Sequence, residues 1–374
     1  MSSLAQTELP RGAELEAMAS GLLGSRVVAI EPQQRGGNNR LYRVTALDGV
    51  YALKFYPRQA ADPRDRQGAE AGALRFLERY AVSSVPRLVA EDRRWGCSAF
   101  DWVEGQPVGQ PGAADVDGAL RFVAELQALA AFDDSARLPL ASAATLSAAA
   151  FCTQIERRLA RCREVAVNAR IGELEEFLEH AFSPIYEQVV EWARARFAAE
   201  KLDFASELPL GRRTLSPSDF GFHNALRRPN GRLVFLDFEY FGWDDPVKMV
   251  ADFLWHPGME LGPGLKSRFA ASATAVFAPG DATFERRLNT LFPLYGLCWV
   301  LIVLNEFLPE SWHRRSLARE GRTELDDGPD IAANTEPTVP VGPDLATVKR
   351  RQLARARKLV EVVGKTYEAG AVFD

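Results

Sequence analysis

The chain has 374 residues, of which 47% are apolar and 25% charged, the balance of an ordinary soluble globular protein. The formal charge of −5 gives no general electrostatic reason to bind nucleic acid or an anionic membrane. The four cysteines form no CxxC pair, and the acidic N-terminus lacks a signal pattern. We therefore expect a cytoplasmic protein with reduced thiols, no nucleic-acid partner and no membrane partner. The sequence carries no signal for an oligomeric state.

The first hundred residues predict a small antiparallel sheet with one inserted helix. A short leading helix over 11–23 precedes three runs with strand character, "RVVAIEPQ", "RLYRVTAL" and "VYALKFYP". The Asp48-Gly49 pair between the last two runs, flanked by alternating apolar residues, is a strong hairpin signal. The inserted helix is predicted in "DPRDRQGAEAGALRFLERY". Two more strands follow in "VPRLVAEDRRWGCSAFDWVEGQPV", ending at Gly105.

The remainder of the chain predicts a larger and mainly helical lobe. Helices are expected at 114–131, 144–166 and 171–200, and "LVFLDFEYF" is expected to be a short strand. The uncharged run 290–304 is shorter than the about 20 residues that a spanning helix needs, which favours a buried core helix.

The C-terminal part predicts a loop and one more helix. Residues 316–343, rich in Gly, Pro, Asp and Thr, predict a long loop, and "LATVKRRQLARARKLVEVV" predicts a closing amphipathic helix. We therefore expect an α+β fold with an N-lobe at 1–105 and a helical C-lobe at 106–374.

Four residues of the predicted N-lobe fit the handling of nucleotide phosphates. Phosphoryl transfer from ATP needs backbone amides over the phosphates and a lysine that holds them. Gly36 and Gly37 lie between two predicted strands, and Lys54 stands in the third strand. Glu70 follows on the inserted helix, where it can pair with Lys54. Each signal alone is weak, because most Gly-Gly pairs are turns and most such charged side chains are solvated.

The stretch "TLSPSDFGFHNAL" contains Asp-Phe-Gly, the letters of the magnesium-binding signature of protein kinases. If the triplet had that function, a catalytic loop would be expected some eighteen residues earlier. Asp203 stands there, but the residue five positions after it is Leu208 rather than asparagine. The triplet therefore needs another interpretation.

Asp219, the first residue of that triplet, fits a catalytic loop better. Asn224 follows it by five positions, and Asp237 follows by eighteen, at the end of the apolar run "RLVFLDFEY". An aspartate that faces the acceptor hydroxyl, with an amide and a second carboxylate for magnesium, is what phosphoryl transfer requires. Singly each acid would be a cap or turn residue. Together with the upstream residues they favour a kinase-like site.

These motifs resemble the aminoglycoside phosphotransferase and choline kinase superfamily, the small-molecule branch of the protein-kinase-like fold. "GGNNRLYRV", "YALKFY", "SDFGFHNAL" and "FLDFEYFGWDDPVKMVADF" are similar to its nucleotide loop, lysine strand, catalytic loop and metal motif. The resemblance implies a two-lobed fold and a kinase that uses ATP and Mg2+. It implies Asp219 as the catalytic base, and Asn224 and Asp237 as metal ligands. The nucleotide-binding residues that it implies are Gly36, Gly37, Asn38, Asn39, Lys54, Glu70 and, at the hinge, Phe100, Asp101, Trp102 and Val103.

The chain departs from the family pattern at one position. Pro217 stands where the family usually has a histidine that braces the catalytic loop. This departure motivates an alternative, a nucleotide-binding pseudokinase that acts as a regulatory module. A protein kinase is a weaker option, because "GWDDP" follows the metal motif almost immediately and leaves little room for a peptide platform.

The acceptor is expected to be a small molecule with a hydroxyl group, such as an amino alcohol, an aminoglycoside or a sugar. Carboxylates and indole rings near the metal motif could receive a cationic or polyhydroxylated compound. For the acids at 244–245 the alternative is that they cap the following helix. The candidate acceptor residues are Glu239, Trp243, Asp244, Trp299 and Glu306.

Overall fold

The computed structural model describes residues 10–33, 39–56, 64–259, 261–309 and 345–369. The chain forms two compact units, each assembled from separate stretches. The first comprises Met1–Ala144, Thr214–Asp244 and Gly258–Glu260, and the second comprises Thr145–Arg213, Asp245–Pro257 and Leu261–Asp374. The predicted lobes at 1–105 and 106–374 stay a prediction. The predicted loop at 316–343 lies outside the described residues.

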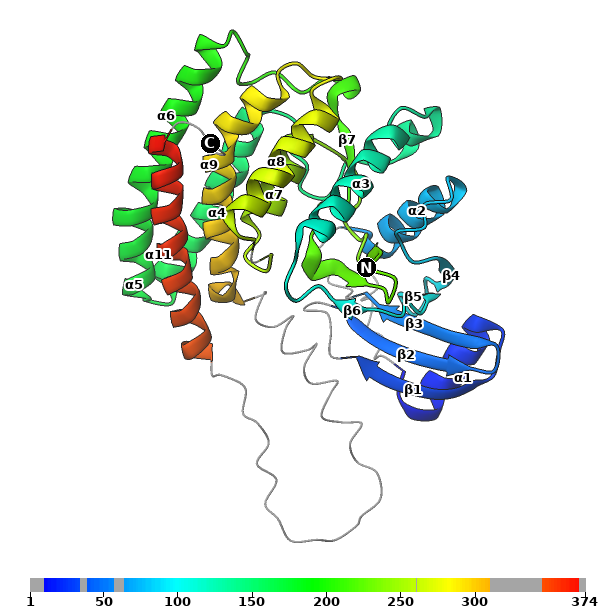
Figure 1. Cartoon of the computed structure of the whole chain (residues 1–374). Coiled ribbons are helices and arrows are strands. Elements are labelled where there is room, and N and C mark those ends of the chain that lie inside the picture. Colours follow the sequence, from blue (N-terminus) through cyan, green and yellow to red (C-terminus); the bar gives the residue numbers. More distant parts are fainter. Residues whose placement is uncertain (1–9, 34–38, 57–63, 260, 310–344, 370–374) are drawn as a thin grey trace, which may run out of the picture. The chain divides into compact units, whose positions relative to one another are not determined.

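A five-stranded antiparallel sheet of order β1-β2-β3-β5-β4 begins the first unit (Figure 1). The predicted hairpin joins β2 to β3, and its register pairs Ala46 with Gly49. Alternate residues of β2 are buried, and Tyr42 and Val44 pack in a cluster with Leu15 of the leading helix α1. The predicted helix and strands of this region are therefore present. Their bounds are α1 Gly12–Leu23, β1 Val27–Gln33, β2 Arg40–Ala46, β3 Gly49–Phe55, α2 Arg66–Arg79, β4 Leu88–Asp92 and β5 Cys97–Asp101.

Two loops of the first unit are held by strands of two or three residues that the sequence analysis did not predict. One sheet has the order β6-β8-β9, and β10 pairs with β7. Residues 217–224 thus run between β7 and β8, and residues 236–241 run between β9 and β10. The predicted strand "LVFLDFEYF" is confined to β9. The bounds are β6 Gln106–Pro107, α3 Ala113–Leu129, β7 Thr214–Ser216, β8 Ala225–Arg227, β9 Leu233–Phe235 and β10 Gly242–Asp244.

An aromatic cluster beneath these loops is built around Phe122 of α3. Its ring stacks on Phe235 at 4.7 Å between centroids and meets Phe220 at 5.9 Å and Phe238 at 6.2 Å. All four rings are buried. Because these rings come from α3, β9 and both loops, the cluster fixes the two loops to the helix.

Replacing Phe122 with Ala is expected to destabilise the protein by about 3–5 kcal/mol, the usual cost of emptying a buried aromatic site. The matched control is Phe132→Ala, because this ring also stacks on a tyrosine but is 48% exposed. Chemical denaturation monitored by circular dichroism measures both variants. Equal losses for the two variants would contradict the central place of Phe122.

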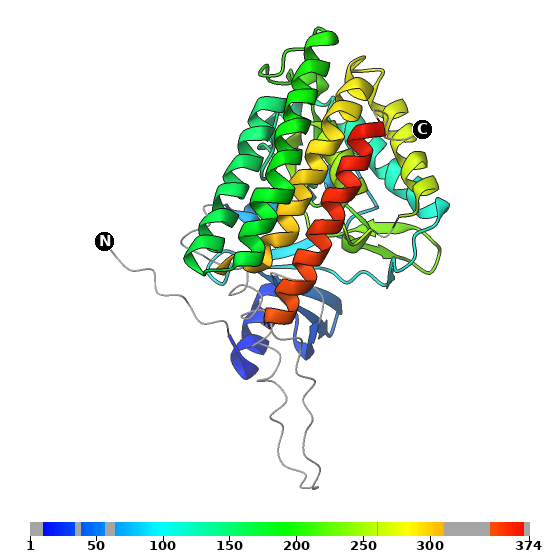
Figure 2. The ribbon, with the colours of Figure 1, turned by 90° about the vertical axis from the view of Figure 1, so that its left-hand side faces the viewer.

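The second unit is a helical bundle in which α9 lies between α6 and α11 (Figure 2). Helices α4 and α7 also pack on α9. The predicted helix at 171–200 is one helical run, in which residues 178–182 form a π-helical turn between α5 and α6. The bounds are α4 Ala148–Asn168, α5 Gly172–Phe177, α6 Ser183–Ala199, α7 Pro246–Trp255, α8 Pro263–Phe277, α9 Phe284–Val303 and α11 Leu345–Ala369.

The stretch Phe284–Phe307, which contains α9, is long and apolar enough to cross a membrane, with a mean hydropathy of 1.6. No other helix within the described ranges meets that criterion. In the structure 83% of this apolar window is buried inside the protein. Burial of this extent supports the predicted core helix, because the bundle itself covers the apolar side chains.

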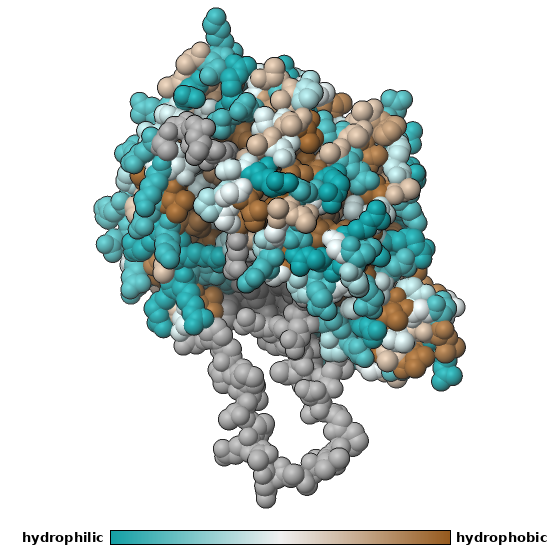
Figure 3. Space-filling model, viewed as in Figure 1, coloured by the Kyte–Doolittle hydropathy of each residue, from teal (hydrophilic) through white to brown (hydrophobic). Residues whose placement is uncertain are grey.

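Hydrophilic residues cover most of the surface seen in Figure 3, with apolar residues interspersed. Single exposed apolar residues are normal on soluble proteins and need no partner to explain them. Among the described residues, the exposed large apolar side chains come from separate elements and loops, and they are Val28, Leu47, Phe132, Leu140, Val167, Leu210 and Val362.

Replacing either of two glycines of the bundle with alanine is expected to change stability, in opposite directions. A Cβ at Gly296 of α9 would lie 2.6 Å from Val363 and 2.7 Å from Trp255, so Gly296→Ala should destabilise by about 1–3 kcal/mol through overpacking. A Cβ at Gly364 of α11 meets nothing within 4 Å. Gly364→Ala should therefore stabilise by up to about 1 kcal/mol through helix propensity. Melting temperatures of both variants check the pair, and a gain for Gly296→Ala would contradict the packing described.

Candidate active site

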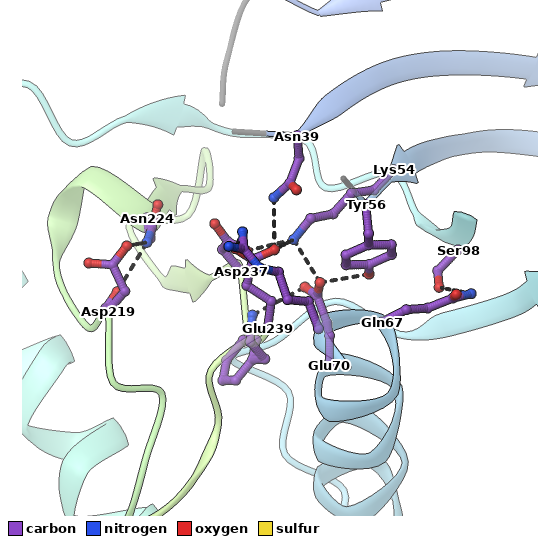
Figure 4. Close-up of polar contacts among 12 residues, drawn as sticks. Asn39, Lys54, Tyr56, Gln67, Glu70, Ser98, Asp219, Asn224, Asp237 and Glu239 are labelled. Carbon is purple, nitrogen blue, oxygen red and sulfur yellow. Dashed lines mark hydrogen bonds and ion pairs between the residues drawn. The ribbon is translucent and has the colours of Figure 1, made fainter. Parts of the chain in front are cut away.

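Lys54 lies at the centre of a buried ionic cluster in the first unit (Figure 4). Strand β3 delivers its side chain, and Nζ donates to Oε2 of Glu70 at 2.7 Å and to Oδ1 of Asp237 at 2.5 Å. The lysine is 7% exposed and Glu70 only 2%. Three predicted site residues, from β3, α2 and the loop after β9, are thus brought together.

Glu70 is held so that it orients the lysine. Oε2 also accepts from the hydroxyl of Tyr56 at 2.7 Å, and Oε1 accepts from the backbone N–H of Phe238 at 3.1 Å. Both carboxylate oxygens are therefore engaged with protein donors. The bond to Phe238 also ties α2 to the residue that follows Asp237.

Asp237 and Glu239 complete the acidic side of the cluster. Carboxylate oxygens of Glu70, Asp237 and Glu239 all lie within 4.8 Å of one another. Glu239 is 3% exposed and accepts from Arg66 Nη1 at 3.1 Å and from Asn39 Nδ2 at 2.9 Å. The predicted acceptor residue Glu239 therefore lies beside the lysine, with both oxygens bonded to protein.

The cluster encloses three carboxylates and two cationic side chains, and these charges together with burial determine the pKa shifts of its residues. Burial raises the pKa of Asp237 to about 7, and the neighbouring Glu239 and Glu70 add to the rise while Lys54 opposes it. Burial lowers the pKa of Lys54, but Asp237 and Glu70 outweigh it and hold that pKa well above its ordinary value. The group thus carries one more acid than base, which favours an additional cation.

These residues fit a magnesium ion by the chemistry of their donors. Mg2+ takes oxygen ligands and is commonly held by one or two carboxylates. The side chain of Asp237 is 30% exposed, so it can reach an ion outside the buried cluster. Among the described residues, Oδ1 of Asn39 is a buried oxygen without a hydrogen-bond partner. Asp237 and Asn39 therefore offer oxygens to a cation, whereas both carboxylate oxygens of Glu70 already accept hydrogen bonds from the protein.

Asp219 lies in the loop between β7 and β8, and its side chain is 39% exposed. Nδ2 of Asn224 donates to the backbone oxygen of Asp219 at 3.0 Å and to Oδ2 at 3.2 Å. The carbonyl of Asn224 accepts from the N–H of Leu236 at 2.8 Å, which joins this loop to the residue before Asp237. Because the amide nitrogen faces Asp219, the amide oxygen of Asn224 is the atom left for a metal.

The loop is braced by hydroxyl groups around Pro217. Oγ of Ser216 accepts from the N–H of Ser218 at 3.0 Å, and the Ser218 hydroxyl donates to the carbonyl of Ser142 at 3.0 Å. Ser218 has a positive φ of 67°, which an L side chain adopts only when its surroundings hold it there. Together with the burial of Phe220, these bonds fix the backbone that presents Asp219.

The predicted hinge lies at the end of β5. Phe100 is buried, and the Asp101 carboxylate accepts from Arg87 Nε at 2.8 Å and Nη2 at 3.0 Å. The N–H of Trp102 donates to Val50 at 3.2 Å. Val103 packs in an apolar cluster with residues of β8 and β9, namely Leu226 and Val234, and with Leu236.

The other four predicted acceptor residues are buried. Trp243 donates from Nε1 to the carbonyl of Ser135 at 2.9 Å, and Asp244 lies in β10 with no exposed surface. In the second unit Trp299 donates to Asp252 at 2.9 Å, and Glu306 is 2% exposed. For the adjacent acid the capping alternative holds, since Asp245 accepts from the N–H of Val247 at the start of α7.

The sequence analysis gave no role to Tyr56, Arg66 or His223. Tyr56 stands two positions after Lys54, and the period-2 geometry of a strand could have placed both side chains on one face. Arg66 bonds Glu239 across 173 positions, and no local signal predicts that pairing. His223 contacts Asp219 from four positions downstream, a spacing that needed the structure to interpret. Gly36, Gly37 and Asn38 lie outside the described residues.

The phosphotransferase enzyme family matches the chain over residues 29–283, which is more than half of its length. The chain belongs to this family. The match includes Lys54, Asp219, Asn224 and Asp237. The protein is therefore a phosphotransferase with an alcohol group as acceptor. No curated protein matches the chain by sequence.

Solved structures with low sequence identity share the fold. A spectinomycin phosphotransferase bound to ADP and spectinomycin is 10% identical with a TM-score of 0.56, and the match covers 96% of this chain and 98% of that one. The ADP-bound aminoglycoside phosphotransferase APH(2'')-Ib is 16% identical with a TM-score of 0.54, and the match covers 82% of this chain and 97% of that one. The choline kinase LicA from Streptococcus pneumoniae is 15% identical with a TM-score of 0.50, and the match covers 93% of this chain and 98% of that one. The chain thus has the two-lobed α+β fold of the protein-kinase-like family, as predicted.

Proposed function

We propose that the protein transfers the terminal phosphoryl group of ATP, with Mg2+, to a hydroxyl of a small metabolite. The observation that carries the proposal is the geometry in Figure 4, where the first unit holds both the Asp219–Asn224 loop and the Lys54 cluster. Phosphoryl transfer depends mainly on positioning and on charge stabilisation, and these two groups supply both.

Each group has a separate role in this proposal. Lys54, oriented by Glu70, binds the phosphates, and the predicted hinge at 100–103 receives the adenine ring. Asp237 and Asn224 would hold Mg2+, which neutralises negative charge on the phosphates when it is bound. Asp219, whose side chain is 39% exposed, orients the acceptor hydroxyl and takes its proton.

The acceptor belongs to the amino alcohols, aminoglycosides or sugars. Support comes from the fold neighbours, whose names specify aminoglycosides, spectinomycin and choline. It also comes from the exposed carboxylate of Asp219, which can face a polyhydroxylated or cationic compound. We place the reaction in the cytoplasm, where ATP is available.

Two measurements on the purified protein test the proposal. Isothermal titration calorimetry measures MgATP binding, and mass spectrometry of reactions with a panel of amino alcohols, aminoglycosides and sugars detects a phosphorylated product. We expect binding and at least one product. Binding of MgATP without any product would favour the pseudokinase alternative, and absence of MgATP binding would reject both.

A further inference from the structure

The carboxylate of Asp219 has a different donor at each oxygen. Asn224 Nδ2 lies 3.2 Å from Oδ2, and His223 Nε2 lies 3.1 Å from Oδ1. An ionised carboxylate only accepts hydrogen bonds, so Nε2 of His223 must carry the proton that is donated. In the neutral imidazole, Nδ1 is then the nitrogen without a proton.

The position of the His223 ring explains the glycine at position 221. A Cβ on Gly221 would lie 2.7 Å from Nδ1 and Cε1 of the ring, and 2.7 Å from Sδ of Met259. The φ of Gly221 is 170°, an extended value that any residue adopts. Glycine is therefore required here for space and not for backbone conformation. The ring lies against the loop backbone, which directs Nε2 towards Asp219.

We propose that His223 is a positioning residue that holds the Asp219 carboxylate in its working orientation. The aspartate is 39% exposed, and a side chain with that much freedom would otherwise sample several rotamers. The two donors, one to each oxygen, restrict it to one orientation. Misplacing a reacting group by about 1 Å can cost about 100-fold in rate. The inference rests on the proposed function.

The central test is a double-mutant cycle between His223→Phe and Asp219→Asn. His223→Phe keeps a ring against the loop and removes the donor, so kcat should fall about 10- to 100-fold while KM for ATP changes little. On the Asp219→Asn background the same change should have no further effect. Gly221→Ala, which displaces the ring, should lower kcat in the same way. His180→Phe is the matched control, because His180 is exposed in the second unit and should leave kcat unchanged.

A second measurement does not depend on turnover. Nitrogen-15 NMR of the histidine-labelled protein should show His223 with its proton on Nε2, and Asp219→Asn should shift that signal. The chain has four histidines, so the His223→Phe variant assigns the resonance.

The outcomes separate this inference from the proposed function. Wild-type kcat in His223→Phe, an additive loss on the Asp219→Asn background, or an Nε2 without a proton would each overturn it. A wild-type protein that transfers phosphoryl to no acceptor and not to water would overturn the proposed function, and the positioning role with it. In that case the NMR signal would still report the contact itself.

Discussion

Asp219→Asn is expected to lower phosphoryl transfer by about 10²–10⁴-fold, the range that a positioned general base contributes. Asparagine keeps the size of the side chain but cannot accept the hydroxyl proton. Because Asp219 does not belong to the Lys54 cluster, MgATP affinity should stay at the wild-type value. Steady-state kinetics with an active acceptor, together with calorimetry of MgATP binding, measure the two effects separately.

The matched control for this prediction is Asp203→Asn. Asp203 is the aspartate that would stand in the catalytic loop if Asp219-Phe220-Gly221 were the metal signature. In the structure it is exposed and only accepts from the N–H of Ala205 at 2.9 Å. We expect wild-type activity for this variant. Activity lost in Asp203→Asn and retained in Asp219→Asn would reverse the assignment of the two loops.

Lys54→Met should abolish detectable transfer and destabilise the fold by about 3–5 kcal/mol. The change leaves the buried carboxylate of Glu70 and the partly exposed carboxylate of Asp237 without their shared cation, and an uncompensated buried charge carries a cost of that size. Urea denaturation measures the free energy of unfolding, and calorimetry should find MgATP binding lost.

Two further variants make the lysine prediction specific. Lys54→Met with Asp237→Asn should recover part of the lost stability, because one of the unpaired acids is removed, but it should not recover activity. Lys365→Met is the surface control, since Lys365 is exposed on α11 and should change stability by less than about 0.5 kcal/mol. A loss below about 1 kcal/mol for Lys54→Met alone would contradict the buried cluster.

Long periodic elements were predictable from the sequence, and very short ones were not. The hairpin between β2 and β3 has its Asp-Gly turn, α9 contains a long uncharged apolar run, and α11 has apolar residues at helical spacing. Strands β7, β8 and β10 have three residues each, too few for an alternation pattern to be recognised. They form only because a partner strand lies beside them, which is tertiary information.

In the candidate site, too, some contacts could be expected from the sequence and others only from the folded structure. Glu70 was expected to be able to pair with Lys54, and the two side chains do form a hydrogen bond. Asp219 and Asn224 were predicted to lie in one loop, but the hydrogen bond between their side chains was not predicted. Glu239 was placed with the acceptor because it lies near Asp237 in the sequence. Its actual partners, Asn39 and Arg66, are 200 and 173 positions away, so only the folded chain identifies them.

The structure makes the pseudokinase alternative, which Pro217 motivated, less favoured. In the sequence the loop lacks the family's usual histidine, which kept a pseudokinase as the alternative to the favoured kinase. The structure supplies hydrogen bonds from Ser218 to Ser216 and Ser142, and both oxygens of Asp219 have donors. A loop held in this way favours catalysis over a regulatory role.

The most direct test of phosphoryl transfer follows labelled phosphate from γ-labelled ATP in the presence of Mg2+. Wild-type protein and Asp219→Asn are incubated side by side with amino alcohols, aminoglycosides and sugars, and the products are separated by chromatography. We predict that the wild-type protein moves the label to at least one of these compounds and that the variant does so about 10²–10⁴-fold more slowly. Label that stays in ATP with every acceptor, or equal transfer by the two proteins, would contradict the account.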